Sequence, residues 1–362
     1  MEIREIANQF DTDGVIGEIK PHGGGHINDS YHLVNSDRAF PDYLLQRINH
    51  YVFKDVPLLM KNMEIVTDHI SSIIKKRDPD NLHRKSLRII PTTEGNSYYK
   101  DPDGNFWRVL NFIQDHVVFE RATDPEIAYE GARMFGNFTF LLAGVDASSL
   151  GDTIPRFHNI KWRLSNLTQS IKENAAGRIN LVKDEIRYVE KSADLMSTIQ
   201  NLGEEGSIPL RVTHNDTKIN NVLFDRNHQG LCVIDLDTVM PGYVHYDMGD
   251  GIRTFTNTGE EDDENLDNIN MDLELYRAFA SGFLDSTRDI LSPTESDTLV
   301  YAGLLFPFIM GVRFLTDYIS GDVYYKIKHK EHNLVRARAQ LRLAQDGESK
   351  LEQCRDIIKS LT

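Results

Sequence analysis

The sequence predicts an α+β protein with two lobes, a small β-rich lobe over residues 1–113 and a larger, mainly helical lobe over residues 114–362. Three observations favour this class. A length of 362 residues suits about two domains of roughly 150 residues each. Short apolar segments separated by turn residues dominate the first lobe, as in antiparallel strands. Beyond it, apolar residues recur at helical spacing over long segments.

The small lobe is expected to consist of short strands and one long helix. The helix should begin after Asp55 as its N-cap, with Pro57 in the first turn and apolar residues at helical spacing as far as Ile74. A glycine-rich turn separates the first two strands, and an Asp-Pro-Asp-Gly turn at residues 101–104 separates the last two. The expected strands are residues 15–20, 30–34, 43–48, 86–91, 97–100 and 106–113.

The large lobe is expected to be helical, with one embedded hairpin. Asp124 and Pro125 are a typical N-cap and first helical residue. The hairpin should pair residues 222–224 with residues 231–234. The expected helices are residues 124–142, 161–174, 184–202, 271–286, 297–318 and 331–345.

Composition and charge exclude several classes of protein. Lys and Arg number 40 and Asp and Glu number 55, so the net charge is 40 − 55 = −15, which argues against binding to nucleic acid or to anionic membranes. Two cysteines, Cys232 and Cys354, are too few for a disulfide framework or a zinc site. The acidic run at residues 260–264 is typical of a solvated loop.

The location and partners follow from similar observations. The N-terminal residues show no signal-peptide pattern, and the longest apolar stretch, around residues 304–312, is far shorter than the ~20 residues that span a bilayer. We therefore expect a cytoplasmic protein, and we infer no membrane, nucleic-acid or obligate protein partner.

The segment from Val212 to Asp237 carries the most informative motif. Protein kinases use a loop of the form H-R-D-x-x-x-x-N, followed after a hairpin by a metal-binding Asp. Here Asp216 and Asn221 have that five-residue separation, and Asp235 follows across the expected hairpin. An Asn- and Asp-rich turn is the alternative for each residue alone, but their joint order and spacing favour kinase chemistry.

The residue types suit phosphoryl transfer, which depends on positioning and charge neutralisation. Asp216 would orient the attacking hydroxyl and accept its proton, and Lys218 would place a positive charge near the transferred phosphate. Asn221 and Asp235 offer the hard oxygen ligands that Mg²⁺ prefers.

The motif resembles the aminoglycoside- and choline-kinase-like phosphotransferases. The wording T-H-N-D-T-K-x-N-N-V-L followed by I-D-L-D-T-V-M-P-G is most similar to the N-acetylhexosamine 1-kinases. The resemblance implies a bilobal kinase-like fold that binds ATP·Mg²⁺ between its lobes. It also implies phosphorylation of the anomeric hydroxyl of N-acetylgalactosamine or N-acetylglucosamine. Other segments that look like this family are residues 45–49, 52–54, 107–108, 246–250, 311–313, 315–318 and 321–326.

The resemblance also assigns the glycine-rich turn to the nucleotide phosphates, since glycine lets backbone N–H groups approach phosphate closely. A plain hairpin turn is the alternative. The residues expected to contact the nucleotide here are Gly23, Gly24, Gly25, His26 and Asn28.

The kinase Lys–Glu pair has no obvious counterpart. Arg47 on the third strand could bridge the phosphates to a carboxylate, and Glu64 on the following helix could supply that carboxylate. The alternative is that both are solvated surface charges.

The remaining assignments are supporting and substrate residues. His214 and Asp247 would support the loop from the large lobe, and Asp237 would either touch a second Mg²⁺ or orient the loop. Arg313 and Tyr324 are the candidate sugar contacts; Arg313, in an apolar helix, needs either a carboxylate such as Asp317 or the ligand as partner.

Two other functions stay open at this point. The chain could phosphorylate another small alcohol, such as an aminoglycoside or choline. It could also be a nucleotide-binding pseudokinase, although the intact set of Asp216, Asn221 and Asp235 argues against that class.

Overall fold

The computed structural model describes residues 2–23 and 27–362, which form two compact units. The first unit comprises Met1–Val118, Leu141–Pro155 and Asn221–Pro241, and the second comprises Phe119–Phe140, Arg156–Asn220 and Gly242–Thr362. Each unit thus combines segments that are distant in sequence, whereas the sequence predicts a single boundary after residue 113. The units are described separately below.

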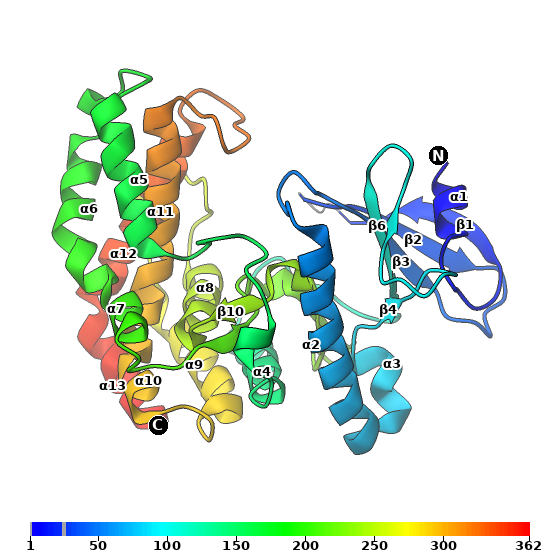
Figure 1. Cartoon of the computed structure of the whole chain (residues 1–362). Helices are drawn as coiled ribbons and strands as arrows, with labels where there is room; N and C mark the ends of the chain where they lie inside the picture. Colours follow the sequence, from blue (N-terminus) through cyan, green and yellow to red (C-terminus); the bar gives the residue numbers. More distant parts are fainter. Residues whose placement is uncertain (1, 24–26) are drawn as a thin grey trace. The chain divides into compact units, whose positions relative to one another are not determined.

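The first unit is built on an antiparallel sheet with the strand order β1-β2-β3-β6-β4, to which β5 adds by pairing with β6 (Figure 1). The third strand has the predicted bounds, and the bounds of the others lie within three residues of those predicted. The strands are β1 Ile16–Pro21, β2 Asp29–Asn35, β3 Tyr43–Ile48, β4 Ile89–Ile90, β5 Tyr99–Lys100 and β6 Phe106–Asn111.

The two faces of this sheet differ in chemistry, because successive strand residues point to opposite sides. One face is an apolar core that includes Leu33, Leu45 and Val109, packed against Ile6 of the short helix α1 (Ile3–Ala7). The other face carries Gln46 and Arg108, which the register of β3 and β6 places opposite each other. The polar pair therefore faces away from the apolar core.

Helix α2 (Val56–Arg77) covers this polar face, since the Arg108 Nη1 lies 2.9 Å from the Met63 Sδ. The predicted cap is confirmed: the Asp55 side chain accepts the Leu58 N–H at 3.0 Å. Three basic residues in the last turn complement the helix dipole. A short helix, α3 (Leu82–Lys85), follows.

The predicted hairpin forms from β8 (Val222–Phe224) and β9 (Gly230–Val233) and belongs to the first unit. Phe224 exchanges two backbone hydrogen bonds with Val117, at 2.8 and 3.0 Å. Buried Asn62 on α2 donates to the carbonyl oxygens of Gly151 (2.7 Å) and Val239 (2.9 Å). Residues after β9 are therefore tied to α2.

The second unit is mainly helical. Helix α11 packs against α5, α8 and α12, and its apolar side chains form much of the core (Figure 1). The helices are α4 Pro125–Leu141, α5 Ile160–Glu173, α6 Lys183–Met196, α7 Thr198–Glu204, α8 Val244–Thr256, α9 Leu273–Thr287, α10 Pro293–Thr298, α11 Ala302–Ser320, α12 His332–Ser349 and α13 Leu351–Leu361; the short strands β7 (Arg211–Thr213) and β10 (Met240–Gly242) precede α8.

Helix α8 was not predicted, and its glycines explain why. Glycine is a poor helix former, so the segment lacks a helical signature in sequence. In the structure, a Cβ on Gly249 would lie 2.5 Å from the Ala302 carbonyl oxygen, and one on Gly251 would lie 2.1 Å from the Phe279 ring. The glycines thus allow α8 to pack closely against α9 and the start of α11. The structure also divides the predicted helices 184–202 and 297–318 into two each and adds α13.

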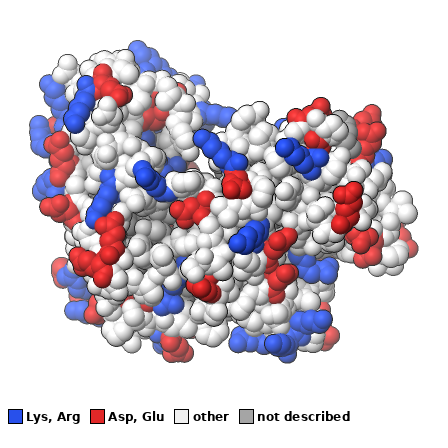
Figure 2. All heavy atoms as spheres, in the orientation of Figure 1, with Lys and Arg blue, Asp and Glu red and all other residues white. Residues whose placement is uncertain are grey.

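One segment, Pro293–Ser320, is long and apolar enough to cross a membrane by length and composition alone. Within its most apolar window, 78% is buried inside the protein, as expected for a core helix. Charged side chains of both signs are interspersed on the face shown in Figure 2, rather than gathered into one basic surface.

Candidate active site

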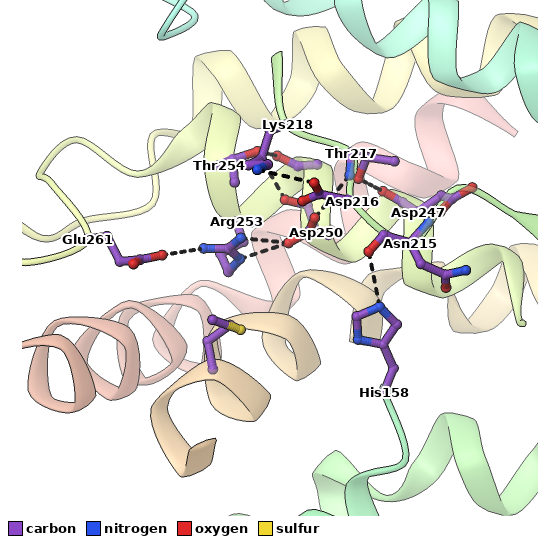
Figure 3. Close-up of polar contacts among 12 residues, drawn as sticks. His158, Asn215, Asp216, Thr217, Lys218, Asp247, Asp250, Arg253, Thr254 and Glu261 are labelled. Atoms are coloured by element: carbon purple, nitrogen blue, oxygen red, sulfur yellow. Dashed lines mark hydrogen bonds and ion pairs between the residues drawn. The ribbon is translucent and has the colours of Figure 1, made fainter. Parts of the chain in front are cut away.

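The loop that carries Asp216 (residues 214–220, the Asp216 loop) follows β7 and is held from below by α8 (Figure 3). The Asp247 carboxylate accepts the backbone N–H of His214 at 2.9 Å and that of Asn215 at 2.7 Å. Asp247 is fully buried, and burial raises its pKa to about 6 even though His214 and both amide hydrogen bonds oppose the shift. Asp247 thus bonds two backbone amides of the Asp216 loop, and its supporting role in catalysis stays a prediction.

Asn215 takes a left-handed backbone conformation, with φ of 65°. Such a conformation is strained for a residue with a side chain and often occurs at functional sites. Two neighbours stabilise it: the Asn215 side chain exchanges hydrogen bonds with Thr213, both at 3.1 Å, and its carbonyl accepts from the His158 Nε2 at 3.2 Å. Burial lowers the pKa of His158 to about 3, so the ring is a neutral donor.

A second carboxylate of α8 holds the middle of the loop. The Asp250 Oδ2 accepts the Thr217 N–H at 3.0 Å, while the Thr217 hydroxyl donates to the Asp247 carbonyl at 2.7 Å. The Asp250 Oδ1 accepts two hydrogen bonds from Arg253, at 2.9 and 2.7 Å. The backbone amides of His214, Asn215 and Thr217, on either side of Asp216, are thus bound to carboxylates of one helix.

Asp216 itself faces outward from this bound backbone. Its carboxylate lies 3.1 Å from the Lys218 Nζ, and the two side chains are 24% and 42% exposed. The Asp216 N–H donates to the His214 Nδ1 at 3.3 Å. A rigid backbone that presents an accessible carboxylate beside an ammonium group is suited to orient a substrate hydroxyl and accept its proton.

The candidate metal ligands lie in the first unit. Asn221 and Asp235 flank the open end of the β8–β9 hairpin, where the Ile234 N–H donates to the Asn221 carbonyl at 2.9 Å. Asp235 is in the left-handed region, with φ of 60°, immediately before a 3₁₀ turn at Leu236–Thr238. One amide oxygen and one carboxylate at the same end of a hairpin fit the ligand preference of Mg²⁺. No group of three or more His, Cys, Asp or Glu suited to a metal occurs among residues 2–23 and 27–362.

Asp237 is bound on both oxygens in the same unit. Its Oδ1 pairs with buried Arg108, and its Oδ2 accepts from the Asn28 Nδ2 at 2.6 Å. Asn28 in turn accepts the Asn49 N–H at 2.9 Å. Of the two roles left open for Asp237, these contacts favour the one that orients the loop carrying Asp235.

The predicted ion pair between Arg47 and Glu64 is not formed within the described part of the chain. Arg47 is exposed and pairs with Asp29, which lies directly opposite it on β2. Neighbouring strand residues face opposite sides, so Gln46 rather than Arg47 shares a face with α2. Glu64 is exposed and lines a hollow with Gln9 and residues 92–100. Nucleotide contacts by Arg47 and Glu64 stay predictions.

Arg108, a buried cation of this unit, was noted in the sequence only within a segment that resembles the family and was given no role there. Its guanidinium contacts the Gln46 Oε1 at 2.8 and 3.0 Å as well as Asp237. The strand alternation that places Arg108 beside Gln46 was the available signal. In the glycine-rich turn, Gly23 has φ of 69°, in the region that favours glycine. Gly24, Gly25 and His26 lie outside the described residues.

The candidate sugar contact Arg313 lies in α11 of the second unit, next to an arginine that sequence reasoning missed. Arg313 lies over the rings of Phe157 and Tyr325, at 5.4 and 5.5 Å from their centres. Burial and the charge of Arg313 lower the pKa of Arg163 to about 10. The Arg163 Nε and the Tyr325 hydroxyl are buried without a hydrogen-bond partner within residues 2–23 and 27–362. Two arginines therefore share one half-buried wall, with no carboxylate among those residues paired to either.

Asp317, suggested as a partner for Arg313, has a different role. Its carboxylate accepts the backbone N–H groups of Val323, Tyr324 and Tyr325, at 2.8–3.0 Å. It thereby anchors the segment that follows α11. Tyr324, the other candidate sugar contact, is 68% exposed on this segment.

The acidic run is largely exposed, as predicted, but several of its members have defined partners. Glu261 lies 3.4 Å from the Arg253 Nη1, and Asp262 pairs with Lys328 at 2.8 Å and His332 at 3.0 Å. The run is therefore fastened to α8 and to the start of α12.

Comparison with known proteins places this geometry in context. The sequence matches the model of the phosphotransferase enzyme family over residues 18–278, more than half of the chain. An aminoglycoside phosphotransferase from Alicyclobacillus acidocaldarius aligns with 100% of this chain and 97% of its own, with a TM-score of 0.64 and 17% identity. Spectinomycin phosphotransferase, solved with ADP and spectinomycin, covers 97% of both chains with a TM-score of 0.59 and 12% identity.

A choline kinase from Cryptosporidium parvum covers 95% of this chain and 92% of its own, with a TM-score of 0.57 and 16% identity. At such identities the likeness shows the fold. The predicted α+β class, with an antiparallel N-terminal sheet and a helical C-terminal portion of kinase-like type, is confirmed.

The raised pKa of Asp247 predicts a pH-dependent stability. Between pH 3.8 and about 6 the folded protein keeps a proton on Asp247 that the unfolded chain has lost. This group therefore lowers the free energy of unfolding as pH rises through that range, by up to ~3 kcal/mol. Asp247→Asn removes this titration. The free energy of unfolding of the variant should therefore rise relative to that of wild type as the pH increases from 4 to 7.

Denaturant unfolding at several pH values measures this difference. Exposed Asp184 on α6 offers a control, Asp184→Asn, whose difference from wild type should stay nearly constant with pH. A constant difference for Asp247→Asn as well would contradict the raised pKa.

Proposed function

Because the chain belongs to the phosphotransferase enzyme family, we propose that it is an ATP-dependent kinase that phosphorylates the anomeric hydroxyl of N-acetylhexosamines to give the sugar 1-phosphate. N-acetylgalactosamine and N-acetylglucosamine are the proposed acceptors. The observation that carries the choice of acceptor is the wall formed by Arg163 and Arg313.

This wall discriminates between acceptor classes by charge. Two neighbouring guanidinium groups, neither of them paired with a carboxylate in the described part of the chain, repel a cationic acceptor such as choline or an amine-rich aminoglycoside. They offer hydrogen-bond donors to neutral oxygen acceptors, such as a hydroxyl group or the carbonyl oxygen of an acetamido group. The Arg163 Nε and the Tyr325 hydroxyl, which are buried without a hydrogen-bond partner within residues 2–23 and 27–362, are two further polar atoms of this wall.

The wall is also connected to the Asp216 loop. Phe157, which lies beneath the Arg313 guanidinium, precedes His158, and His158 donates to the carbonyl of Asn215. Arg313 is close enough to contribute to the lowered pKa of His158, after burial and against the influence of Asp250. An acceptor bound at the arginine wall would therefore lie near the proposed base in the same unit.

In the proposed reaction, Asp216 orients the anomeric hydroxyl and accepts its proton as the oxygen attacks the terminal phosphorus of ATP, whose bond to the bridging oxygen breaks to release ADP. The Lys218 ammonium, 3.1 Å from the Asp216 carboxylate, places positive charge near the transferred group. Asn221 and Asp235 would hold Mg²⁺, which when bound neutralises charge on the phosphates. Asp237, fixed by Arg108 and Asn28, orients the loop that carries Asp235.

Phosphorus NMR on reaction mixtures tests the proposed function. The purified chain is incubated with ATP and Mg²⁺ and with, in turn, N-acetylgalactosamine, N-acetylglucosamine, an aminoglycoside and choline. We expect an anomeric phosphate signal with one or both acetylated sugars. Product formed with the cationic acceptors alone would assign the enzyme to that other branch, and no product with any acceptor would contradict the proposal.

The arginine wall predicts a specific kinetic defect. Arg163→Met and Arg313→Met should each raise the KM for the acetylated sugar by about tenfold or more, the effect of losing a charge-assisted hydrogen bond. The KM for ATP should change little. Arg187→Met, at an exposed arginine of α6, is the control and should behave as wild type. An unchanged sugar KM in both wall variants would exclude the wall from acceptor binding.

A further inference from the structure

Arg253 is a buried arginine that the proposed chemistry leaves without a role. It lies on α8 with 9% of its side chain exposed and donates two hydrogen bonds to a single oxygen of Asp250, at 2.9 and 2.7 Å. Figure 3 shows this pair beside the Asp216 loop. The other oxygen of Asp250 accepts the Thr217 N–H at 3.0 Å. Arg253 is therefore one residue removed from the backbone that carries Asp216.

The charge of Arg253 compensates the burial of the Asp250 carboxylate. Burial alone would raise the pKa of Asp250, but the charge and hydrogen bonds of Arg253 outweigh burial and hold that pKa below its ordinary value. The nearby charge of Lys218 acts in the same direction more weakly. Without Arg253, Asp250 would be a buried carboxylate lacking its main counter-charge, a costly state that it would escape by protonation or movement.

The outer side of Arg253 faces the acidic run. Its Nη1 lies 3.4 Å from the Glu261 Oε2, and the adjacent Asp262 is bound to Lys328 and His332. These contacts join the segment after α11, which carries Tyr324, to the Asp250–Thr217 contact. This path of polar contacts, with one covalent step from Glu261 to Asp262, lies wholly within the second unit.

We propose that Arg253 is a positioning residue, which holds the Asp250 carboxylate against the Thr217 N–H and so fixes the backbone on either side of Asp216. Glu261 is the outer anchor of Arg253. The effect on turnover rests on the proposed function, whereas the effect on the loop backbone does not.

Amide hydrogen exchange tests the structural part without any substrate. In Arg253→Met, the Thr217 amide should exchange about tenfold faster or more, because it loses a charged acceptor. The amides of His214 and Asn215, held by Asp247, should change much less. The matched control is Arg133→Met, which breaks a pair of the same i,i+3 type with Glu130 on α4. An unchanged Thr217 amide in Arg253→Met would overturn the proposal.

Turnover on the best acceptor tests the consequence. A misplaced base loop costs on the order of 10²-fold, so kcat in Arg253→Met should fall by about that factor, with a smaller change in KM. Arg253→Lys keeps the positive charge but loses the planar guanidinium that donates two hydrogen bonds. Its kcat should lie between those of wild type and Arg253→Met. Arg133→Met should lose stability but keep wild-type kcat.

A double variant separates positioning from a general structural role. If Arg253 acts through Asp250, then Asp250→Asn combined with Arg253→Met should lose no more kcat than the worse single variant. Losses that multiply would overturn the proposal. Should Arg253→Met fail to fold, Arg253→Lys and Asp250→Asn give the same comparison of amide exchange. Absence of turnover in wild type would contradict the proposed function instead, while the exchange result would still decide the role of Arg253.

Discussion

The Asp216 loop depends on a carboxylate that the protein buries completely. The backbone amides of His214 and Asn215 are buried and would be costly without acceptors, and Asp247 supplies both. That arrangement requires α8 to lie directly beneath the loop, and the glycines of α8 permit its close packing against neighbouring helices. The strain at Asn215, the buried charge and the close-packed helix are thus consequences of one constraint, a rigid loop that leaves Asp216 accessible.

The first unit also uses a buried carboxylate to hold a loop in place. Asp237 is fixed by Arg108 and Asn28, so the loop after the hairpin is held from the polar face of the sheet. In each unit a buried carboxylate, Asp247 or Asp237, holds a loop in place. A second aspartate on that loop, Asp216 or Asp235, is then available for the proposed chemistry. This division explains why the Asp residues of one motif differ so strongly in burial and partners, and why replacing one kind is expected to affect structure and the other kind turnover.

The sequence was informative where local chemistry decides the outcome. The spacing of Asp216, Asn221 and Asp235, the Asp55 cap and the alternating strands were all readable because each depends on neighbours in the chain. The pairing of Arg108 with Asp237 was not, because it joins residues 129 positions apart, and Arg47 was the more obvious cation. Helix α8 could not be predicted because its glycines, which allow close packing, are poor helix formers. Arg163 could not be predicted because no motif surrounds it.

The central claim is that Asp216 is the base of a phosphoryl transfer and that its loop is held independently of it. Turnover and ATP affinity of Asp216→Asn, measured on the folded variant, test this claim most directly, with Asp297→Asn at an exposed site of α10 as control. The account predicts that kcat falls by ~10²–10⁴-fold, the usual contribution of a general base, while ATP affinity changes little. A kcat within about threefold of wild type, far below that range, would contradict the role of Asp216 and with it the account of the loop.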